Sequence, residues 1–233
     1  MKQLSVKVKD FYSNLKFPGP YSLEDFCYYQ KGYRNEFINV YEKGVQDRAF
    51  VLDVGCGTGF ITNYLAYMYP RTKFVGVDFS DSIDYAQYFI KKYKLKNVSY
   101  YKQDFLNFNQ GTYDCIISNG VLHHIPEYET AMLKIKNMLT DDGKLILGVY
   151  NTYGKLAKKF ITVKYKTEML RKDQEEVPFE ISFSNGEFLR YFSDFNVDEI
   201  YPSLDNRFVN ARNLLNYKNG GLTIYRLDRK QYD

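Results

Sequence analysis

Residues 51–60 read VLDVGCGTGF, a run of β-forming residues followed by three glycines within five positions. A helix that starts directly after a strand presents unpaired backbone N–H groups. Glycines at that point let a ligand approach the backbone and permit positive φ. The stretch therefore predicts a ligand-binding loop between a strand and a helix.

The loop differs from a dinucleotide-binding fingerprint in its spacing and its charge. That fingerprint has glycines at its first, third and sixth positions, whereas Gly55, Gly57 and Gly59 stand at the first, third and fifth. Asp53 precedes them by two residues, and its carboxylate would repel a pyrophosphate but attract a cationic amino-acid ligand. The loop thus points away from NAD and toward S-adenosylmethionine, which carries an ammonium group and a sulfonium.

Outward from this loop, short β-rich runs alternate with helical ones. The expected strands are 49–54, 73–78, 97–101, 113–118 and 144–150, and the expected helices are 58–69, 80–93 and 126–139. The sequence DDG at 141–143 predicts a turn between the last helix and the last strand. Such alternation with apolar strands is typical of a parallel sheet covered by helices on both faces.

The remaining segments flank this core, and the whole chain, 1–233, is interpreted as one domain with the cofactor-binding core at 48–150. Residues 1–47 contain a turn, FPGP at 17–20, and aromatic residues at helical spacing, which predict an N-terminal helical lid. Residues 151–183 are expected to form a helical cap, with a helix over 154–172. Residues 184–233 are expected to supply a closing helix at 184–193 and two strands at 195–203 and 221–230.

The composition excludes several classes of protein. The 233 residues carry a net charge of +4, which by itself is too weak to indicate nucleic-acid binding. Three separated cysteines and two histidines offer no metal-ligand spacing. The start has no signal-peptide core, and no apolar run approaches the ~20 residues of a membrane span. We therefore expect a cytoplasmic protein with no metal and no membrane partner.

Five stretches in order carry a resemblance to a known family. They are VLDVGCGTG (51–59), FVGVDFSDSIDYA (74–86), YKQDF (101–105), YDCIISNGVLHHI (113–125) and MLTDDGKLIL (138–147). Together they resemble the motifs of the class I S-adenosylmethionine-dependent methyltransferases, most closely over residues 49–150. The resemblance implies an α/β, Rossmann-like sheet of seven mostly parallel strands in the order 3-2-1-4-5-7-6, with the last strand antiparallel and helices on both faces.

The resemblance also implies a set of cofactor-binding residues at the carboxyl ends of the strands. They are Asp53, Gly55, Cys56, Gly57, Gly59, Asp78, Phe79, Gln103, Asp104, Phe105 and Asn119. The glycines would line the methionine and ribose parts of the cofactor, and Asp53 would support the ammonium group. Asp78 would accept from both ribose hydroxyls, or cap a helix. Cys56 is expected to be a small buried residue rather than a nucleophile.

The other cofactor contacts would surround the adenine and the methionine end. Phe79 would pack on the adenine, and Asp104 would accept from its amino group or be an ordinary loop carboxylate. Phe105 would donate its backbone N–H nearby. Asn119 would face the methionine end.

Candidates for chemistry and substrate binding lie around the fourth and fifth strands and in the flanks. His123 and His124 are candidate general bases, although a pair at this place in the family is often packed rather than catalytic. The candidate substrate-binding residues are Tyr12, Tyr21, Tyr28, Tyr150, Asn151 and Tyr153. Seven basic residues within 155–172 could hold a phosphorylated substrate or RNA, or form a solvated helix face.

These features favour transfer of a methyl group from S-adenosylmethionine to N or O of a small polar metabolite, with S-adenosylhomocysteine as the second product. One alternative is an RNA-modifying methyltransferase, favoured if the basic segments share one face. A second is a methyltransferase-like partner subunit that binds the cofactor without catalysis. An NAD-dependent oxidoreductase is disfavoured by the glycine spacing.

Overall fold

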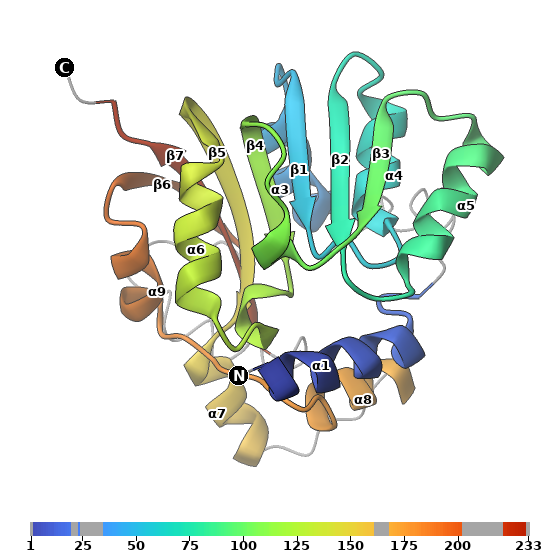
Figure 1. Ribbon diagram of the computed structural model, residues 1–233. Helices are drawn as coiled ribbons and strands as arrows, with labels where there is room; N and C mark the ends of the chain where they lie inside the picture. The colour runs from blue at the N-terminus through green and yellow to red at the C-terminus, as the bar shows by residue number, and fades with distance from the viewer. Residues whose placement is uncertain (1, 20–22, 24–34, 161–167, 202–220, 232–233) are drawn as a thin grey trace.

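The protein is built around one seven-stranded sheet (Figure 1), seen in a computed structural model that describes residues 2–19, 23, 35–160, 168–201 and 221–231. Its strands are β1 (Phe50–Val54), β2 (Lys73–Asp78), β3 (Val98–Lys102), β4 (Tyr113–Asn119), β5 (Leu139–Tyr150), β6 (Phe195–Tyr201) and β7 (Leu222–Arg229). Their order is β3-β2-β1-β4-β5-β7-β6, and β7 is antiparallel to both of its neighbours. The predicted fold class and strand order are confirmed.

Helices cover both faces of the sheet. One face packs against α3 (Asn35–Val45), α4 (Phe60–Met68) and α5 (Ile83–Tyr93), and the other against α6 (Tyr128–Asn137) and α9 (Asn185–Tyr191). Strand β1 contributes residues to the hydrophobic core on both faces of the sheet. Leu52 and Val54 pack in the cluster that contains α6, whereas Val51 packs in the cluster that contains α3 and α4. Successive strand residues point to opposite faces, so a wholly apolar strand is buried on both sides.

Three further helices gather beneath the carboxyl ends of the parallel strands (Figure 1). They are α1 (Lys2–Leu15), α7 (Thr152–Phe160) and α8 (Glu168–Glu175). The hydroxyl of Tyr12 on α1 donates to Asp173 on α8 at 2.9 Å, so segments 161 residues apart in the chain meet there. This is the edge at which open α/β sheets bind ligands.

Two local predictions differ from the structure. The turn predicted at 141–143 lies inside β5, because that strand starts at Leu139, directly after α6. Its pairing with β4 jumps there: Leu139 pairs with Tyr113 and Lys144 with Cys115, so Asp141-Asp142-Gly143 form an irregularity within the strand. The helix expected over 154–172 is represented by two helices, α7 and α8, while 161–167 lies outside the described residues. The aromatic residues predicted at helical spacing are Phe26, Tyr29, Tyr33, Phe37 and Tyr41. Phe37 and Tyr41 lie on α3, and the other three lie outside the described residues.

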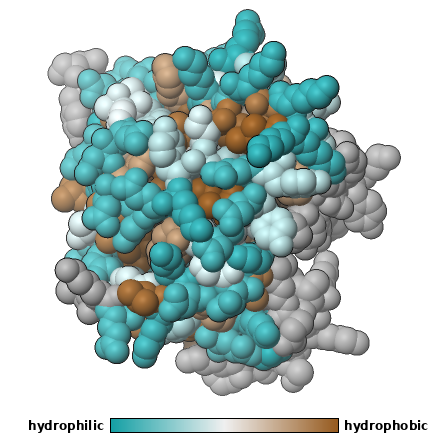
Figure 2. All heavy atoms as spheres, turned by 45° about the vertical axis from the view of Figure 1, so that its right-hand side comes forward, coloured by the Kyte–Doolittle hydropathy of each residue, from teal (hydrophilic) through white to brown (hydrophobic). Residues whose placement is uncertain are grey.

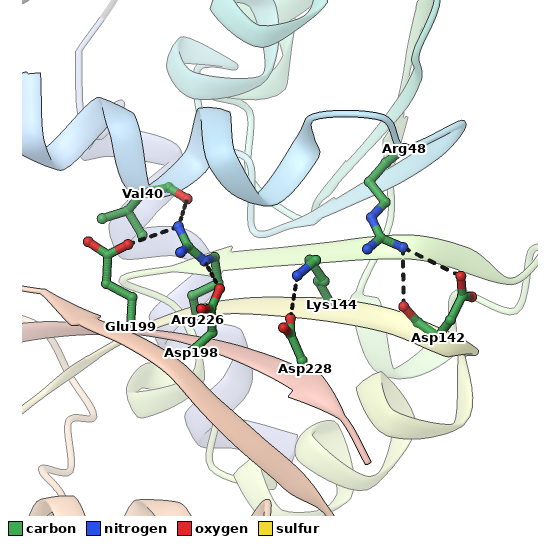
Figure 3. A network of polar contacts seen from close by, with 8 residues as sticks. All are labelled: Val40, Arg48, Asp142, Lys144, Asp198, Glu199, Arg226 and Asp228. Atoms are coloured by element: carbon green, nitrogen blue, oxygen red, sulfur yellow. Dashed lines mark hydrogen bonds and ion pairs between the residues drawn. The ribbon is translucent and has the colours of Figure 1, made fainter. Parts of the chain in front are cut away.

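The β6–β7 edge is held by a network of charges (Figure 3). Arg226 on β7 is only 7% exposed, and its guanidinium bonds Asp198 at 2.6 Å and Glu199 at 2.9 Å. The two acids are consecutive on β6, and the register shifts between Val197 and Glu199, which is the signature of a β-bulge. Because of the bulge, the side chains of Asp198 and Glu199 both reach Arg226. Arg226 also donates to Val40 O on α3, at 3.5 Å, and so ties that helix to the edge.

The surface is mainly polar on the face that Figure 2 shows, with hydrophobic residues in small patches among hydrophilic ones. Individual exposed hydrophobic residues such as Tyr67, Tyr88 and Leu133 are normal for a globular protein. Within the described part of the chain, no helix is long and apolar enough to cross a membrane.

Candidate active site

The glycine loop joins β1 to α4 and takes the left-handed conformations that its sequence predicts. The φ angles of Gly55, Gly57 and Gly59 are 71°, 53° and 72°. The loop is fixed to β2 by three hydrogen bonds. Gly55 N and Cys56 N donate to Val77 O at 2.7 and 3.2 Å, and Gly57 N donates to Asp78 Oδ2 at 2.8 Å. Neighbouring segments leave no room for a larger residue, because a Cβ on Gly55 would overlap the side chain of Val121.

The N-terminal segment lies directly on this loop. A Cβ on Gly57 would come 2.5 Å from Phe17 O, and Thr58 Oγ1 donates to Gly19 O at 2.7 Å. The end of α1 is held nearby, since Ser82 Oγ donates to Tyr12 O at 3.3 Å. Residues of the predicted lid thus contact the predicted cofactor loop.

Two buried carboxyl groups support the loop. Asp53 is 5% exposed and accepts a hydrogen bond from Thr62 Oγ1. Burial raises the pKa of Asp53 from 3.8 to about 7; the Thr62 hydrogen bond acts in the opposite direction and Asp78 adds to the rise. Asp78, at the end of β2, accepts from Gly57 N, from Ser80 N at 2.8 Å and from Ser80 Oγ at 2.6 Å. Burial raises the pKa of Asp78, and these hydrogen bonds counteract the rise.

The remaining candidates lie at or just after the ends of β1, β2 and β3. Gln103 N donates to Asp78 O at 2.9 Å, which ties the end of β3 to that of β2. Asp104 Oδ1 accepts from Leu106 N at 2.9 Å and caps the short helix η1 (Phe105–Asn107). Phe105 is buried in the core, Phe79 is half-buried, and Cys56 is buried with a free thiol.

Asn119, at the end of β4, carries a buried oxygen without a partner. Its Oδ1 accepts no hydrogen bond among the described residues. Buried polar atoms are nearly always paired, so such an oxygen indicates a place where a donor belongs. An ammonium group is a donor of this kind.

The hydrogen bonds of His123 and His124, on the short helix η2 (Leu122–His124), assign a different tautomer to each ring. Tyr150 N donates to His123 Nδ1 at 3.3 Å, so the ring proton of a neutral His123 is on Nε2. His124 Nδ1 lies 3.0 Å from Phe179 O, and because a carbonyl only accepts, His124 keeps its proton on Nδ1 and has a lone pair on Nε2.

Burial determines the charge of both rings. It lowers the pKa of His123 well below its ordinary value, and it lowers the pKa of His124 although Asp173 opposes the change. Both rings are therefore neutral at neutral pH. Of the two candidate bases, only His124 has a free basic nitrogen.

Next to the histidines lies a cluster in which the candidate substrate residues Tyr12 and Tyr150 contact a buried acid, Asp173, that the sequence did not single out. Asp173 on α8 is 3% exposed and accepts from Tyr12 OH at 2.9 Å and Tyr150 OH at 2.8 Å. Burial, with Asp173 adding, raises the pKa of both phenols, so their hydroxyls keep the protons that they donate. Lys155 Nζ lies 3.9 Å from the centroid of the Tyr150 ring and 2.5 Å from Glu180 Oε1.

The other predicted substrate residues fall into two groups. Asn151 is fully buried, its amide donates to Asn185 Oδ1 at 3.0 Å, and its Oδ1 accepts from Tyr153 N at 2.9 Å. These contacts hold the start of α7. Tyr21 and Tyr28 lie outside the described residues.

A family model described as "Methyltransferase domain" matches residues 46–205, which is more than half of the chain. The chain belongs to the class I S-adenosylmethionine-dependent methyltransferases. The predicted family is thereby confirmed. The match spans the five motifs and the loop described above.

The curated proteins that this chain resembles carry the names of different methyl acceptors. The chain is 26% identical over 172 residues to malonyl-[acyl-carrier protein] O-methyltransferase of Bacillus anthracis, covering 71% of this chain and 61% of that one. It is 30% identical over 105 residues to (S)-coclaurine N-methyltransferase of Papaver somniferum, covering 44% and 30%. The chain spans about half to three fifths of the length of the first curated relatives that it matches.

Solved structures share the fold at low identity. The N-methyltransferase NodS of Bradyrhizobium japonicum WM9, in complex with S-adenosyl-L-homocysteine, superposes with a TM-score of 0.62 at 13% identity and covers 97% of this chain and 99% of its own. The plantazolicin methyltransferase BpumL, in complex with a monoazolic desmethylPZN analogue and S-adenosyl-L-homocysteine, gives a TM-score of 0.61 at 18% identity, with 99% of this chain and 97% of that chain covered. These likenesses show the fold.

Proposed function

We propose that this protein binds S-adenosylmethionine on the glycine loop and transfers its methyl group to N or O of a small polar metabolite. The observation that supports this most is the joint arrangement of three left-handed glycines, the buried acids Asp53 and Asp78, and the unpartnered Asn119 Oδ1 at one sheet edge. A cationic amino-acid ligand fits such a site, because it supplies a donor for the Asn119 oxygen and a positive charge beside the two buried acids.

Each part of the cofactor would have its own residues. Asp53 and Asn119 would serve the ammonium end, Asp78 the ribose, and Asp104 with Phe79 the adenine. When bound, the cofactor supplies a methyl group already activated by its attachment to a positively charged sulfur.

The chain then has to align the acceptor, exclude water and accept a proton where the acceptor holds one. Helices α1, α7 and α8 cover the strand ends, which favours exclusion of water. His124 Nε2 would accept the proton, since that nitrogen carries the lone pair. His123 would stay a neutral donor.

Several contacts disfavour the RNA-modifying alternative. Of the three basic residues of 155–172 whose side chains are described, Lys155 pairs with Glu180 and Arg171 pairs with Glu175 and Glu176, while Lys172 is exposed. Charges neutralised within the chain release no counterions from RNA.

The test is a methyl-labelling experiment. The purified protein is incubated with methyl-labelled S-adenosylmethionine and either whole or desalted cell extract, and RNA, protein and small molecules are then separated. The proposal predicts label among small molecules that disappears on desalting. Label in RNA or protein that survives desalting would contradict it.

A further inference from the structure

Asp173 is a buried carboxylate that has only neutral donors for partners. Its oxygens accept from the phenols of Tyr12 and Tyr150, and no described Lys, Arg or His side chain forms an ion pair with it. Burying a carboxylate is costly unless a positive charge compensates it. Two phenols satisfy its hydrogen bonding without supplying that charge.

The rest of the cluster does not supply the charge either. Lys155 is engaged by Glu180, so this pair is neutral as a whole, and burial keeps His123 and His124 uncharged. Among the described residues, no positive charge in the cluster is left to compensate Asp173. The second oxygen of Glu180, Oε2, is buried and has no hydrogen-bond partner among the described residues, so a further donor is called for.

An independent observation marks the same place as a ligand site. His123 is fully buried, yet its Nε2 has no hydrogen-bond partner in the described part of the chain. Its ring centroid lies 4.1 Å from those of His124 and Tyr150, so the unpartnered nitrogen belongs to this cluster. The His123 Nε2 carries the ring proton, so it calls for an acceptor atom on the ligand, whereas Glu180 Oε2 calls for a donor.

The aromatic rings complete a surface suited to a cation. Tyr12, Tyr150 and His124 form successive ring contacts, with centroids 5.6 Å apart for Tyr12–His124 and 5.8 Å for His124–Tyr150. Aromatic faces attract an ammonium group, and Lys155 over the Tyr150 ring shows one such contact within the chain itself.

We propose that the methyl acceptor is a cationic, amine-bearing metabolite whose ammonium group is bound by Asp173 and Glu180 between the Tyr12 and Tyr150 rings. This inference rests on the proposed function and adds the class of acceptor to it. It separates this protein from relatives named for malonyl-[acyl-carrier protein], because a malonyl group presents a free carboxylate that Asp173 would repel.

The experiment uses the full chain and a polar-metabolite extract separated at neutral pH into cation-exchange, anion-exchange and unretained fractions. Each fraction is incubated with methyl-labelled S-adenosylmethionine. Label in the cation-exchange fraction supports the inference. Label confined to the anion-exchange or unretained fraction overturns it and leaves the proposed function standing. Label in no small-molecule fraction overturns both.

Asp173→Asn tests the residue, with Glu175→Gln as the matched control, since Glu175 is an exposed acid on the same helix. We expect Asp173→Asn to raise the amount of the cation-exchange fraction that gives half-maximal methyl transfer by about ten- to a hundredfold. That factor is the size of a lost charge-assisted hydrogen bond. The affinity of Asp173→Asn for S-adenosylhomocysteine, measured by calorimetry, should match that of Glu175→Gln and wild type. The assignment of Asp173 would be overturned if Asp173→Asn left this amount unchanged, or if Glu175→Gln raised it equally.

Discussion

Replacing Asp53 with asparagine should change how the stability of the protein depends on pH. Burial raises the pKa of this carboxyl to about 7 in the folded protein, against an ordinary value of 3.8. Between these two values the folded state keeps a proton that the unfolded state has lost. The free energy of unfolding therefore falls as pH rises through this window, because the unfolded state binds fewer protons.

The size of the effect follows from the shift. Each pKa unit corresponds to about 1.4 kcal/mol, so the full shift destabilises the folded protein by about 4 kcal/mol above neutral pH. Below the ordinary pKa of an aspartate both states hold the proton, and this cost is absent. An asparagine side chain cannot ionise, so the variant lacks this contribution at every pH, although Thr62 can still donate to the amide oxygen.

The assay is urea denaturation of wild type and Asp53→Asn at several values from about pH 5 to about pH 8. The difference between the two unfolding free energies isolates Asp53 from other titrating groups, including Asp78, which both proteins retain. The variant should gain on wild type by about 2 kcal/mol between about pH 5 and about pH 7, where the folded carboxyl becomes half ionised. If the unfolding free energies of the two proteins changed in parallel with pH, the pKa of Asp53 would not be raised in the folded protein.

Three further substitutions test the loop, the base and the lid contact. Gly55→Ala should destabilise the protein by about 2–4 kcal/mol in thermal denaturation, since its φ is positive and its Cβ overlaps Val121; Gly186→Ala, which has open space, should not, and equal effects would contradict the argument. His124→Gln should reduce methyl-transfer turnover by about a hundredfold or more while calorimetry shows unchanged affinity for S-adenosylhomocysteine; unchanged turnover would exclude it as the base. Tyr12→Phe should lower the unfolding free energy by about 1–3 kcal/mol, because a buried carboxylate loses one of its two donors; no loss in urea denaturation would mean that water replaces the hydroxyl.

The sheet and the positions at its edge could be predicted because their signals are local. Apolar runs such as those ending at Asp53, Asp78 and Asn119 mark buried strands, and a polar residue at the end of each run marks the ligand edge. The glycine loop could be predicted for the same reason, since glycine adopts positive φ most readily and three glycines stand within five positions.

The cluster around Asp173 could not be predicted in the same way. Asp173 stands in a charged helix, EMLRKDQE, and only folding places it between Tyr12 and Tyr150. The tautomers of the two histidines likewise depend on backbone atoms far away in sequence, at Phe179 and Tyr150. The turn expected at 141–143 failed because β-pairing with β4 absorbs those residues into an irregular strand.

We infer that the glycine loop is a site for S-adenosylmethionine rather than for a dinucleotide. Isothermal titration calorimetry of the purified protein with S-adenosylhomocysteine and, separately, with NAD distinguishes the two ligands. We expect saturable binding of S-adenosylhomocysteine at one site for each chain and no binding of NAD. Binding of NAD alone, or of neither ligand, would contradict it.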